Sequence, residues 1–350
     1  MADWRIREAT DAHEAQALDL LARGLNLPRF DREFWDWRYR DAPPGKGIVL
    51  VAEAGGRVIG VVGAIPFAML AGDQELLTYQ GVDSYVDADY RGRGVFAALG
   101  AALVDHMADR GGHIAWAFTS PMSHGAYTGK LGYRHVTDVP YWVTPTGVSH
   151  PGATHIRRGL LTGAGCLAEW LGGRRRLRGM LDGLSVRTTS DPADLAVLAG
   201  DLALGVGPRL HVVPSPEFLD WRFRRHPWHP YDVRLVGGDQ PTAGIITRGQ
   251  NLVLMLASDS DDSWRAAIAA ALETARDGGA GDVHAYLMGC PAPERHLRKS
   301  AFLRWRHSWH PFGLYSRQRL VARALRDIGD IPALAEDGWH LQMAHVACGL

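Results

Sequence analysis

The sequence predicts an α+β (mixed α/β) protein built from two tandem copies of one domain. The first observation is an internal repeat, because residues 33–40 (EFWDWRYR) recur as residues 217–224 (EFLDWRFR). At the same offset, Gly60 and Gly244 occupy matching places in two apolar runs. The second observation is the order of strand-like and helix-like segments, which is the same in both halves.

Each copy is expected to begin at a helix cap. Thr10-Asp11 and Ser190-Asp191 precede Ala/Leu-rich stretches, and such side chains accept hydrogen bonds from the free amides of a first helical turn. The aromatic-rich repeat forms the next helix. In the first copy, the later elements are strands over 48–53 and 58–63 joined by the turn 54–56, strands over 81–86 and 113–118, and a helix over 97–107. An alternating stretch over 337–347 predicts a last strand.

These patterns divide the chain into residues 1–146, a linker over 147–183 and residues 184–350. The linker combines a helical stretch over 160–171 with the basic run 174–178 (RRRLR). Such a run is either a solvated face or a patch for an anionic ligand.

Composition limits the classes of function. The chain has 350 residues, 46% of them hydrophobic, and a formal net charge of zero, which predicts a packed core and argues against general nucleic-acid binding. Cys166, Cys290 and Cys348 form no metal-binding or disulfide spacing, so a reducing cytoplasm is expected. No signal peptide, membrane span or metal site is expected. The richness in Ala, Arg and Gly suggests a bacterial source.

The strongest motif is the turn over 90–96 (YRGRGVF), between an expected strand and an expected helix. Successive backbone N–H groups and a helix N-terminus can hold a phosphate there. Arg91 and Arg93 add guanidinium groups that pair well with phosphate oxygens. The alternative is a tight turn that only glycine tolerates.

Together with residues 120–134 (SPMSHGAYTGKLGYR), this turn resembles the GNAT superfamily of acetyl-coenzyme A-dependent N-acetyltransferases. That family carries a Q/R-x-x-G-x-G/A pyrophosphate loop, in which Arg91 and Gly94 match and Phe96 departs from the third fixed position. The resemblance covers most of the chain as two tandem GNAT-like domains, each a mixed, mostly antiparallel sheet flanked by helices. The second copy is expected to be degenerate, because residues 252–264 hold three aspartates and no glycine, which would repel a pyrophosphate.

The resemblance implies transfer of an acetyl group from acetyl-CoA to a primary amine of a small molecule, by direct attack in a ternary complex. An amino sugar, an antibiotic or a biosynthetic precursor would be the acceptor. It implies no metal, and no nucleic-acid or membrane partner is expected; the protein would be a monomer or a homodimer. The alternatives are a non-catalytic acyl-CoA-binding module and another acyl or aminoacyl transferase on the same fold.

The resemblance also implies which residues bind the cofactor. The main chain of the strand end would pair with the pantetheine amides, and the turn and helix start would bind the pyrophosphate. The expected binding residues are Ser84, Tyr85, Val86, Arg91, Gly92, Arg93, Gly94, Val95, Phe96 and Ala97.

For proton transfer, Asp83 is the candidate base. Burying an unpaired carboxylate in an apolar strand is costly, and such an environment raises its pKa toward a range useful for a base. The alternatives are a salt bridge to an arginine, or a water chain, since Gln80 stands near the place where some relatives keep a glutamate. Tyr127 is the candidate acid near the coenzyme A sulfur, although the family spacing falls on Thr128. His124 is a further candidate at that site.

The aromatic residues of the repeat divide into two groups. Trp37 and Trp221 are present in both copies and are expected in the core. Trp35 is replaced by Leu219 in the second copy, so it is free to touch the acceptor. Trp35 and His124 are therefore the expected acceptor-binding residues.

Overall fold

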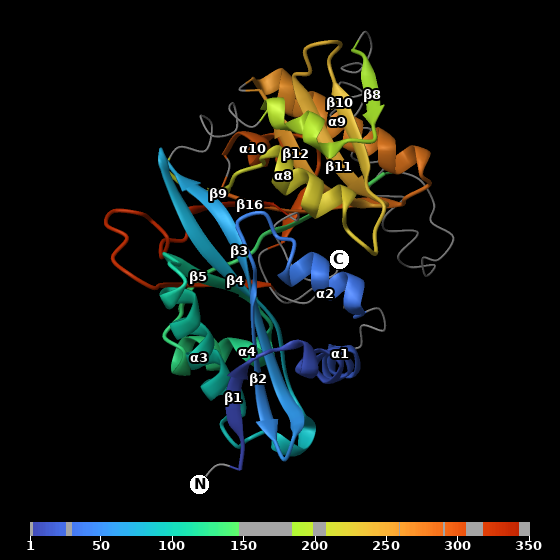
Figure 1. The fold of residues 1–350 in the computed structure, drawn as a ribbon. Coiled ribbons are helices and arrows are strands. Elements are labelled where there is room, and N and C mark those ends of the chain that lie inside the picture. Colours follow the sequence, from blue (N-terminus) through green and yellow to red (C-terminus); the bar gives the residue numbers. More distant parts are fainter. Residues whose placement is uncertain are drawn as a thin grey trace.

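The computed structural model in Figure 1 describes residues 3–25, 30–146, 184–198, 208–258, 260–289, 291–305 and 318–342. The expected linker over 147–183, with its helix and its basic run, lies outside the described residues. The described part is a mixed α/β structure, as the sequence predicts.

The N-terminal copy follows the predicted order of elements, but an additional strand over residues 5–8 precedes the first helix and another over residues 141–145 follows the last predicted strand. Its strands are β1 (Arg5–Glu8), β2 (Ile48–Ala54), β3 (Arg57–Ala71), β4 (Gln74–Val86), β5 (Ile114–Thr119), β6 (Arg134–Asp138) and β7 (Tyr141–Pro145). Its helices are α1 (Asp11–Leu25), α2 (Arg32–Tyr39), the 3₁₀ turn η1 (Ala88–Tyr90), α3 (Val95–Asp109) and α4 (Pro121–Lys130).

The C-terminal copy repeats most of this order. Its strands are β8 (Val186–Thr189), β9 (Leu210–Val212), β10 (Asp232–Val236), β11 (Ala243–Arg248), β12 (Asn251–Ala257), β13 (Asp282–Met288), β14 (Leu303–Trp305), β15 (Arg319–Ala324) and β16 (Trp339–Gln342). Its helical segments are η2 (Pro192–Leu198), α8 (Pro216–Leu219), the π-helical η3 (Asp220–Arg224), α9 (Asp261–Asp277) and α10 (Pro291–Lys299).

The α2 and α4 helices begin at side-chain caps. The Asp31 carboxylate accepts the Phe34 amide (2.9 Å) at the start of α2, and Ser120 and Ser123 form a reciprocal capping box at the start of α4. The α1 helix begins at Asp11, as the sequence predicts. These caps satisfy amides that the helices themselves leave free.

The two copies exchange strands. The β7 strand, the last strand of the N-terminal copy, lies antiparallel to β13 and β14 of the C-terminal copy. In return, β15 lies between β5 and β6 of the N-terminal copy and is antiparallel to both. Cutting the chain at 146 and 184 therefore separates two sequence copies but not two complete sheets.

Two short strands then join the sheets into one. The β9 strand pairs with β3, and it runs parallel to β16, which in turn pairs with β13. The predicted last strand is thus present as β16, at the junction between the blue-to-green copy and the yellow-to-orange copy in Figure 1.

A reciprocal tryptophan pair marks the contact between the repeats. The indole N–H of Trp37 donates to the Trp221 carbonyl, and the indole N–H of Trp221 donates to the Trp37 carbonyl, each at 2.7 Å. The two rings are stacked with centroids 5.1 Å apart, and both are buried. This confirms the core position expected for the pair, and it gives the repeats a pseudo-twofold contact.

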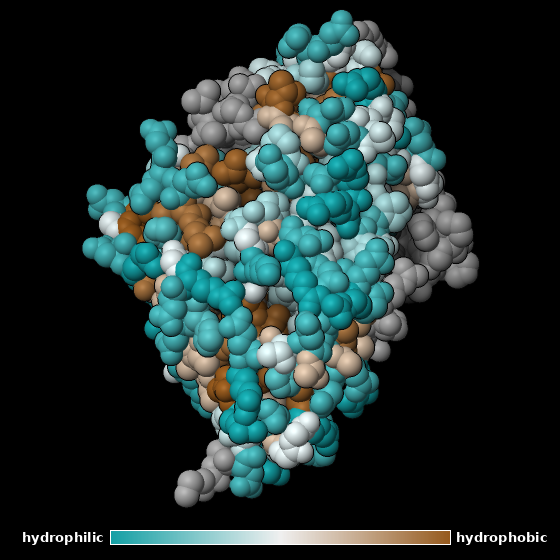
Figure 2. Space-filling view, in the orientation of Figure 1, coloured by the Kyte–Doolittle hydropathy of each residue, from teal (hydrophilic) through white to brown (hydrophobic). Residues whose placement is uncertain are grey.

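The buried side chains form two clusters. One lies under α3 and β2–β5, and the larger one runs from α1 and α2 through the junction into the C-terminal copy. Hydrophilic groups dominate the face shown in Figure 2, and hydrophobic groups appear there in small separate areas. The hydrophobic side chains therefore lie mainly in a core shared by both copies.

Candidate functional site

The site begins at a bulge near the end of β4. Val61 is paired with Tyr85 and Gly63 with Val82, so one residue of β3 faces two of β4. The two residues of β4 that face one residue of β3 are Asp83 and Ser84, and Asp83 has φ +51°. Aspartate is among the few side chains that tolerate this left-handed conformation. The bulge turns the end of β4 away from the regular sheet.

Beyond the bulge, β4 and β5 separate. Their parallel pairing covers only the four steps from Thr78–Ile114 to Gly81–Ala117. The main chain of Tyr85 and Val86 therefore has a strand neighbour in β3 but not in β5, and Ser84 in the bulge is in register with neither strand. An extended ligand can add its amides to such an edge in the manner of a further strand.

The Asp83 side chain is held by a buried polar cluster. The Arg38 Nη1 atom donates to both carboxylate oxygens of Asp83, at 2.6 and 2.7 Å, and the Tyr39 hydroxyl donates to Oδ2 at 2.5 Å. The Arg38 and Asp83 side chains are only 4% and 8% exposed. Burial and the Asp83 carboxylate raise the pKa of Tyr39 well above its ordinary value, so the phenol stays a donor.

Close approach of this cluster to the sheet requires Gly63. A Cβ at that position would lie 2.2 Å from the Tyr39 hydroxyl oxygen, which no side chain can accommodate without a shift. The Arg38–Asp83 ion pair is the salt bridge that was expected as the alternative to a catalytic role of Asp83. This geometry favours a role in holding the bulge over the expected role as a base.

The predicted phosphate turn leads from β4 into α3. Gly92 and Gly94 have φ values of +73° and +82°, and a Cβ on either would meet no atom within 4 Å. Gly94 is the N-cap of α3 and offers no side-chain cap. The first amides of a helix lack intrahelical partners, so the amides around Val95, Phe96 and Ala97 are available to an anion.

The two arginines of the turn are exposed and lie over tyrosine rings. The Arg91 guanidinium lies 5.2 Å from the Tyr85 ring centroid and donates from Nε to the Val86 carbonyl (3.2 Å) and from Nη2 to the Tyr85 hydroxyl (2.9 Å). Arg93 lies 5.2 Å from the Tyr90 ring centroid. These contacts fix Arg91 beside the open edge of β4 and keep both positive charges near the start of α3.

The open strand edge and the start of α3 face a cavity of about 500 Å³. Its walls come from α1, β4, the start of α3, β5 and α4. Among the sequence-predicted site residues, the cavity is lined by Asp83, Ser84, Tyr85, Val86, Arg91, Phe96 and Tyr127. The structure therefore brings most of the expected cofactor and catalytic residues together.

Tyr127 lies on α4 at the point where β4 and β5 separate. A Cβ on Gly81, the last paired residue of β4, would be 3.5 Å from the Tyr127 hydroxyl oxygen. The Phe96 ring packs edge-on against Tyr127, with centroids 5.9 Å apart. Burial raises the pKa of Tyr127, and a hydrogen bond with the Ser84 side chain opposes this only in part. The phenol is thus a protonated group inside the cavity at neutral pH.

The alternatives to Tyr127 have other partners. The Thr128 hydroxyl donates to the His124 carbonyl (3.0 Å) within α4. The His124 Nδ1 atom lies 3.0 Å from the Thr119 hydroxyl, and its ring packs on His135. Burial and the nearby positive charge of Arg319 lower the pKa of His124. Neither residue is among those that line the cavity.

The other expected acceptor residue, Trp35, lies in the core. It is buried, and its ring packs edge-on against Tyr39 with centroids 4.9 Å apart. It does not line the cavity either, which instead has the exposed Met122 and the partly buried Phe118 on the side of α4 and β5.

The second copy has closed the corresponding site. Gly60 faces Val86 and Gly244 faces Leu256, so Met255 takes the place of Tyr85. The Gln342 side chain of β16 accepts the Met255 amide and donates to the Met255 carbonyl, both at 2.8 Å. A strand of the chain itself therefore uses the edge that is open in the first copy.

The start of α9 is closed as well. Its N-cap Ser260 accepts the Ser263 amide (3.0 Å), and Asp261 and Asp262 stand in its first turn. A capped helix start with two carboxylates does not attract an anion. This explains physically why only the first copy is expected to bind the cofactor.

Three functional positions escaped the sequence analysis. Arg38 and Tyr39 belong to the repeat, which drew attention to their tryptophan neighbours instead. Gln342 carries no motif at all. The repeat could have signalled Arg38, because Arg222 stands at the matching place. Nothing in the sequence tells which strand edge Gln342 will cover.

Comparisons with known proteins agree with this geometry. Residues 5–136 match the acetyltransferase (GNAT) domain family, which defines the class of this domain. No curated protein matches the chain in sequence. Residues 5–136 are therefore a GNAT acetyltransferase domain, a class that uses an acyl-CoA co-substrate.

Solved structures resemble almost the whole chain. A GCN5-related N-acetyltransferase from Anabaena variabilis is 14% identical, with a TM-score of 0.62, and the match covers 92% of this chain and 73% of that one. A GCN5-related N-acetyltransferase from Kribbella flavida is 19% identical (TM-score 0.58; 92% and 71% covered). Eis1 from Mycobacterium abscessus is 16% identical (TM-score 0.53; 92% and 74% covered). At these identities the likeness is one of fold.

The described residues contain neither a metal-binding cluster nor a membrane-spanning helix. Within the described ranges, no three or more His, Cys, Asp or Glu side chains gather in a way that could hold a metal ion. No helix among the elements described here is long and apolar enough to cross a membrane.

Proposed function

We propose that the N-terminal copy transfers the acetyl group of acetyl-CoA to a primary amine of a small molecule by direct attack in a ternary complex. The observation that carries this proposal is one cavity that joins an open strand edge, an uncapped helix start and a buried tyrosine. Each part serves a different need of the reaction.

Binding would use main-chain groups. The edge of β4 at Ser84–Val86 offers amides and carbonyls to the pantetheine arm, and the amides at the start of α3 face the pyrophosphate. The open space beside Gly92 and Gly94 lets the diphosphate approach the backbone closely. Arg91 and Arg93 would supply the opposite charge.

The thioester supplies an acetyl carbonyl carbon and a thiolate leaving group. The amine nitrogen forms a bond to that carbon, and the carbon–sulfur bond breaks. We propose that the departing sulfur takes a proton from Tyr127, because the buried Tyr127 phenol is protonated at neutral pH. The phenol regains its proton from the solvent side of the cavity.

The amine must lose a proton as well. Asp83, the residue expected for this step, already accepts hydrogen bonds from Arg38 and Tyr39. We therefore assign to Asp83 the holding of the bulge, and we assign the removal of the amine proton to water at the Gln80 side of the cavity. Gln80 lines that cavity.

The acceptor class proposed is an amino sugar, an antibiotic or a biosynthetic precursor with a primary amine. A cytoplasmic location and a monomeric or homodimeric state stay predictions from the sequence.

A free-thiol release assay tests the proposal. Acetyl-CoA is supplied with a panel of amino sugars, aminoglycosides, nucleosides and amino acids, and the released thiol is followed spectroscopically. At least one amine should give turnover that Tyr127→Phe lowers. Tight binding of acetyl-CoA without thiol release for any amine would instead support the non-catalytic acyl-CoA-binding module.

A further inference from the structure

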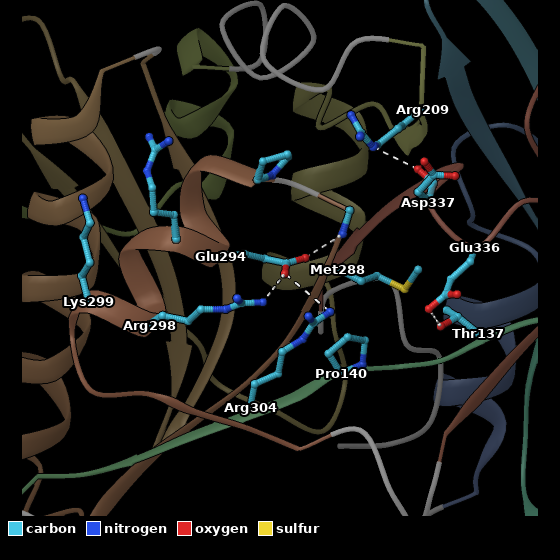
Figure 3. A pocket seen from close by; sticks show the side chains of 13 residues that line it. Thr137, Pro140, Arg209, Met288, Glu294, Arg298, Lys299, Arg304, Glu336 and Asp337 are labelled. Carbon is cyan, nitrogen blue, oxygen red and sulfur yellow. Dashed lines mark hydrogen bonds and ion pairs between the residues drawn. The ribbon is translucent and has the colours of Figure 1, made fainter.

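The walls of the candidate site differ in chemistry from those of a second cavity, of about 880 Å³, at the junction of the two copies. The junction cavity is lined mostly by charged side chains, among them Glu294, Arg298 and Lys299 (Figure 3). The cavity of the candidate site is lined mostly by uncharged side chains. Since the acceptor amine must fit against these uncharged walls, their chemistry indicates what kind of amine it is.

The cavity of the candidate site has walls on both faces of the sheet. The α3 helix lies on one face and α1 on the other (Figure 1). Among the lining residues, Phe96 and Tyr127 pack in the core cluster under α3. Leu25, Val82 and Phe118 pack against the larger cluster, which contains α1 and α2. The uncapped helix start and the proposed acid thus belong to the α3 side, which leaves the α1 side for the acceptor.

The wall on the α1 side is apolar and in part aromatic. The Phe118 ring is partly buried and packs edge-on against Trp116, with centroids 5.7 Å apart. The Tyr85 ring lies directly against α1, because a Cβ on Gly24 would come within 2.5 Å of three of its ring carbons. Both rings line the cavity. An apolar group of the acceptor would be removed from water against this wall, which is favourable.

The charges on the walls do not suit an acceptor with several ammonium groups. Among the described residues that line the cavity, Asp83 is the one carboxylate, and it is ion-paired with Arg38 at 2.6 Å. Arg91 adds a positive charge to the same walls. A polyamine would therefore bring charges that find no matching carboxylates there. An amine with a single ammonium group has only one proton to lose, and an apolar wall lowers its pKa, which favours the neutral nucleophile.

Building on the acetyl transfer proposed for this site, we infer that the acceptor is a primary monoamine with an apolar body, of the arylalkylamine class. Leu25, Val82 and Phe118 bind the apolar body on the α1 side. The amine nitrogen points between β4 and β5 toward the thioester carbon. Among the proposed acceptors, this geometry favours such an amine over an amino sugar or an aminoglycoside, which would bring hydroxyl and ammonium groups to an apolar wall.

Steady-state thiol release from acetyl-CoA tests the acceptor class with four amines. Phenethylamine carries one amine and one ring, and ethylamine lacks the ring. Glucosamine carries one amine on a polar ring, and neamine carries several amines. The kcat/KM for phenethylamine should exceed each of the other three by about tenfold or more, since apolar pockets discriminate by at least this factor when an apolar group is missing.

Two variants change the α1-side wall. Phe118→Ala removes a ring and should raise KM for phenethylamine about tenfold, with a smaller change for ethylamine. Leu25→Glu adds a carboxylate, so it should lower kcat/KM for phenethylamine and raise kcat/KM for neamine. Val197→Glu adds the same charge at an exposed position outside the cavity and is the matched control, which should change neither. Circular dichroism and calorimetric titration with acetyl-CoA check that each variant is folded.

The outcomes separate the acceptor class from acetyl transfer itself. Preference for phenethylamine, weakened by Phe118→Ala and shifted toward neamine by Leu25→Glu, supports the apolar acceptor. A kcat/KM for glucosamine or neamine that equals or exceeds that for phenethylamine overturns the acceptor class but keeps acetyl transfer. The same holds if Leu25→Glu and wild type have equal kcat/KM values for all four amines. Acetyl-CoA binding without thiol release for these amines and for the wider panel overturns both.

Discussion

At the scale of single residues, the site depends on how buried charge is held. The carboxylate of Asp83 is removed from solvent, and hydrogen bonds from the Arg38 guanidinium and the Tyr39 phenol compensate for this. The same three groups fix a non-glycine residue in a left-handed conformation at the point where β4 turns outward. We therefore assign a positioning role to the cluster of Arg38, Tyr39 and Asp83, although its groups resemble those of a proton-transfer site.

The Asp83→Asn variant separates these two roles. Asparagine tolerates the left-handed conformation, but it removes one partner of the buried Arg38–Asp83 ion pair, which costs about 3–5 kcal/mol of unfolding free energy. We expect lower stability in urea and a raised KM for acetyl-CoA, with a smaller change in kcat. The double variant Arg38→Met/Asp83→Asn should recover part of the stability. Unchanged stability together with a collapse of kcat would restore Asp83 as the base.

Tyr127→Phe tests the proposed acid. Removing the hydroxyl group takes away the proton donor for the leaving sulfur but leaves the ring packed on Phe96. Turnover should fall by about tenfold or more, with little change in acetyl-CoA affinity. Tyr133→Phe is the matched control, because Tyr133 is buried and packs on Tyr127 but does not line the cavity. Equal rates for wild type and Tyr127→Phe would place the acid elsewhere.

At the scale of elements, the junction strands bring two histidines together in the core. His211 of β9 and His340 of β16 are register partners, and both are buried. Burial, followed by the positive charge of a protonated His211, lowers the pKa of His340 to about 3. Burial also lowers the pKa of His211. Both histidines are therefore neutral in the folded protein near neutral pH.

This arrangement predicts loss of stability in acid. The unfolded chain binds a proton on His340 near pH 6.5 and the folded chain only near pH 3, so stability is full above pH 6.5 and falls as pH drops below it. Between pH 7 and pH 5, His340 alone should cost about 2 kcal/mol. Urea unfolding at several pH values measures this, and His340→Leu should flatten the slope. Identical slopes for both proteins would contradict the assignment.

At the scale of the whole molecule, the exchanged strands make the copies interdependent. Without β15, the edges of β5 and β6 in the N-terminal copy are unpaired, and without β7 those of β13 and β14 are. Unpaired edges promote aggregation.

Residues 1–146 expressed alone should therefore fail to form a monomeric, cooperatively folded domain. Mixing or co-expressing two pieces cut within 147–183 should restore a one-to-one complex that binds acetyl-CoA. Size-exclusion chromatography with light scattering measures the molar mass of the isolated fragment and the stoichiometry of the complex. Wild-type acetyl-CoA binding by residues 1–146 alone would refute interdependence.

The sequence allowed prediction of what local patterns encode. The two copies, the turn at Gly92–Gly94 and the core position of Trp37 and Trp221 follow from spacing, repetition and glycine chemistry. The exchange of β7 and β15 could not be predicted, because strand periodicity tells which face is buried but not which neighbour a strand joins. For the same reason, the hydrogen bonds of Gln342 to Met255 of β12 could not be predicted. Trp35 was misleading because its replacement in the second copy suggested exposure, whereas Tyr39 covers it in the first.

The central claim is that the first copy holds one acyl-CoA site and the second copy has closed its own. Calorimetric titration of acetyl-CoA into the full chain tests it directly, with Gly94→Asp as the site variant. Gly56→Asp is the matched control, since Gly56 has φ +80° in an open hairpin turn. We expect one acetyl-CoA per chain for wild type and Gly56→Asp and none for Gly94→Asp. Two molecules per chain, or binding that survives Gly94→Asp, would contradict it.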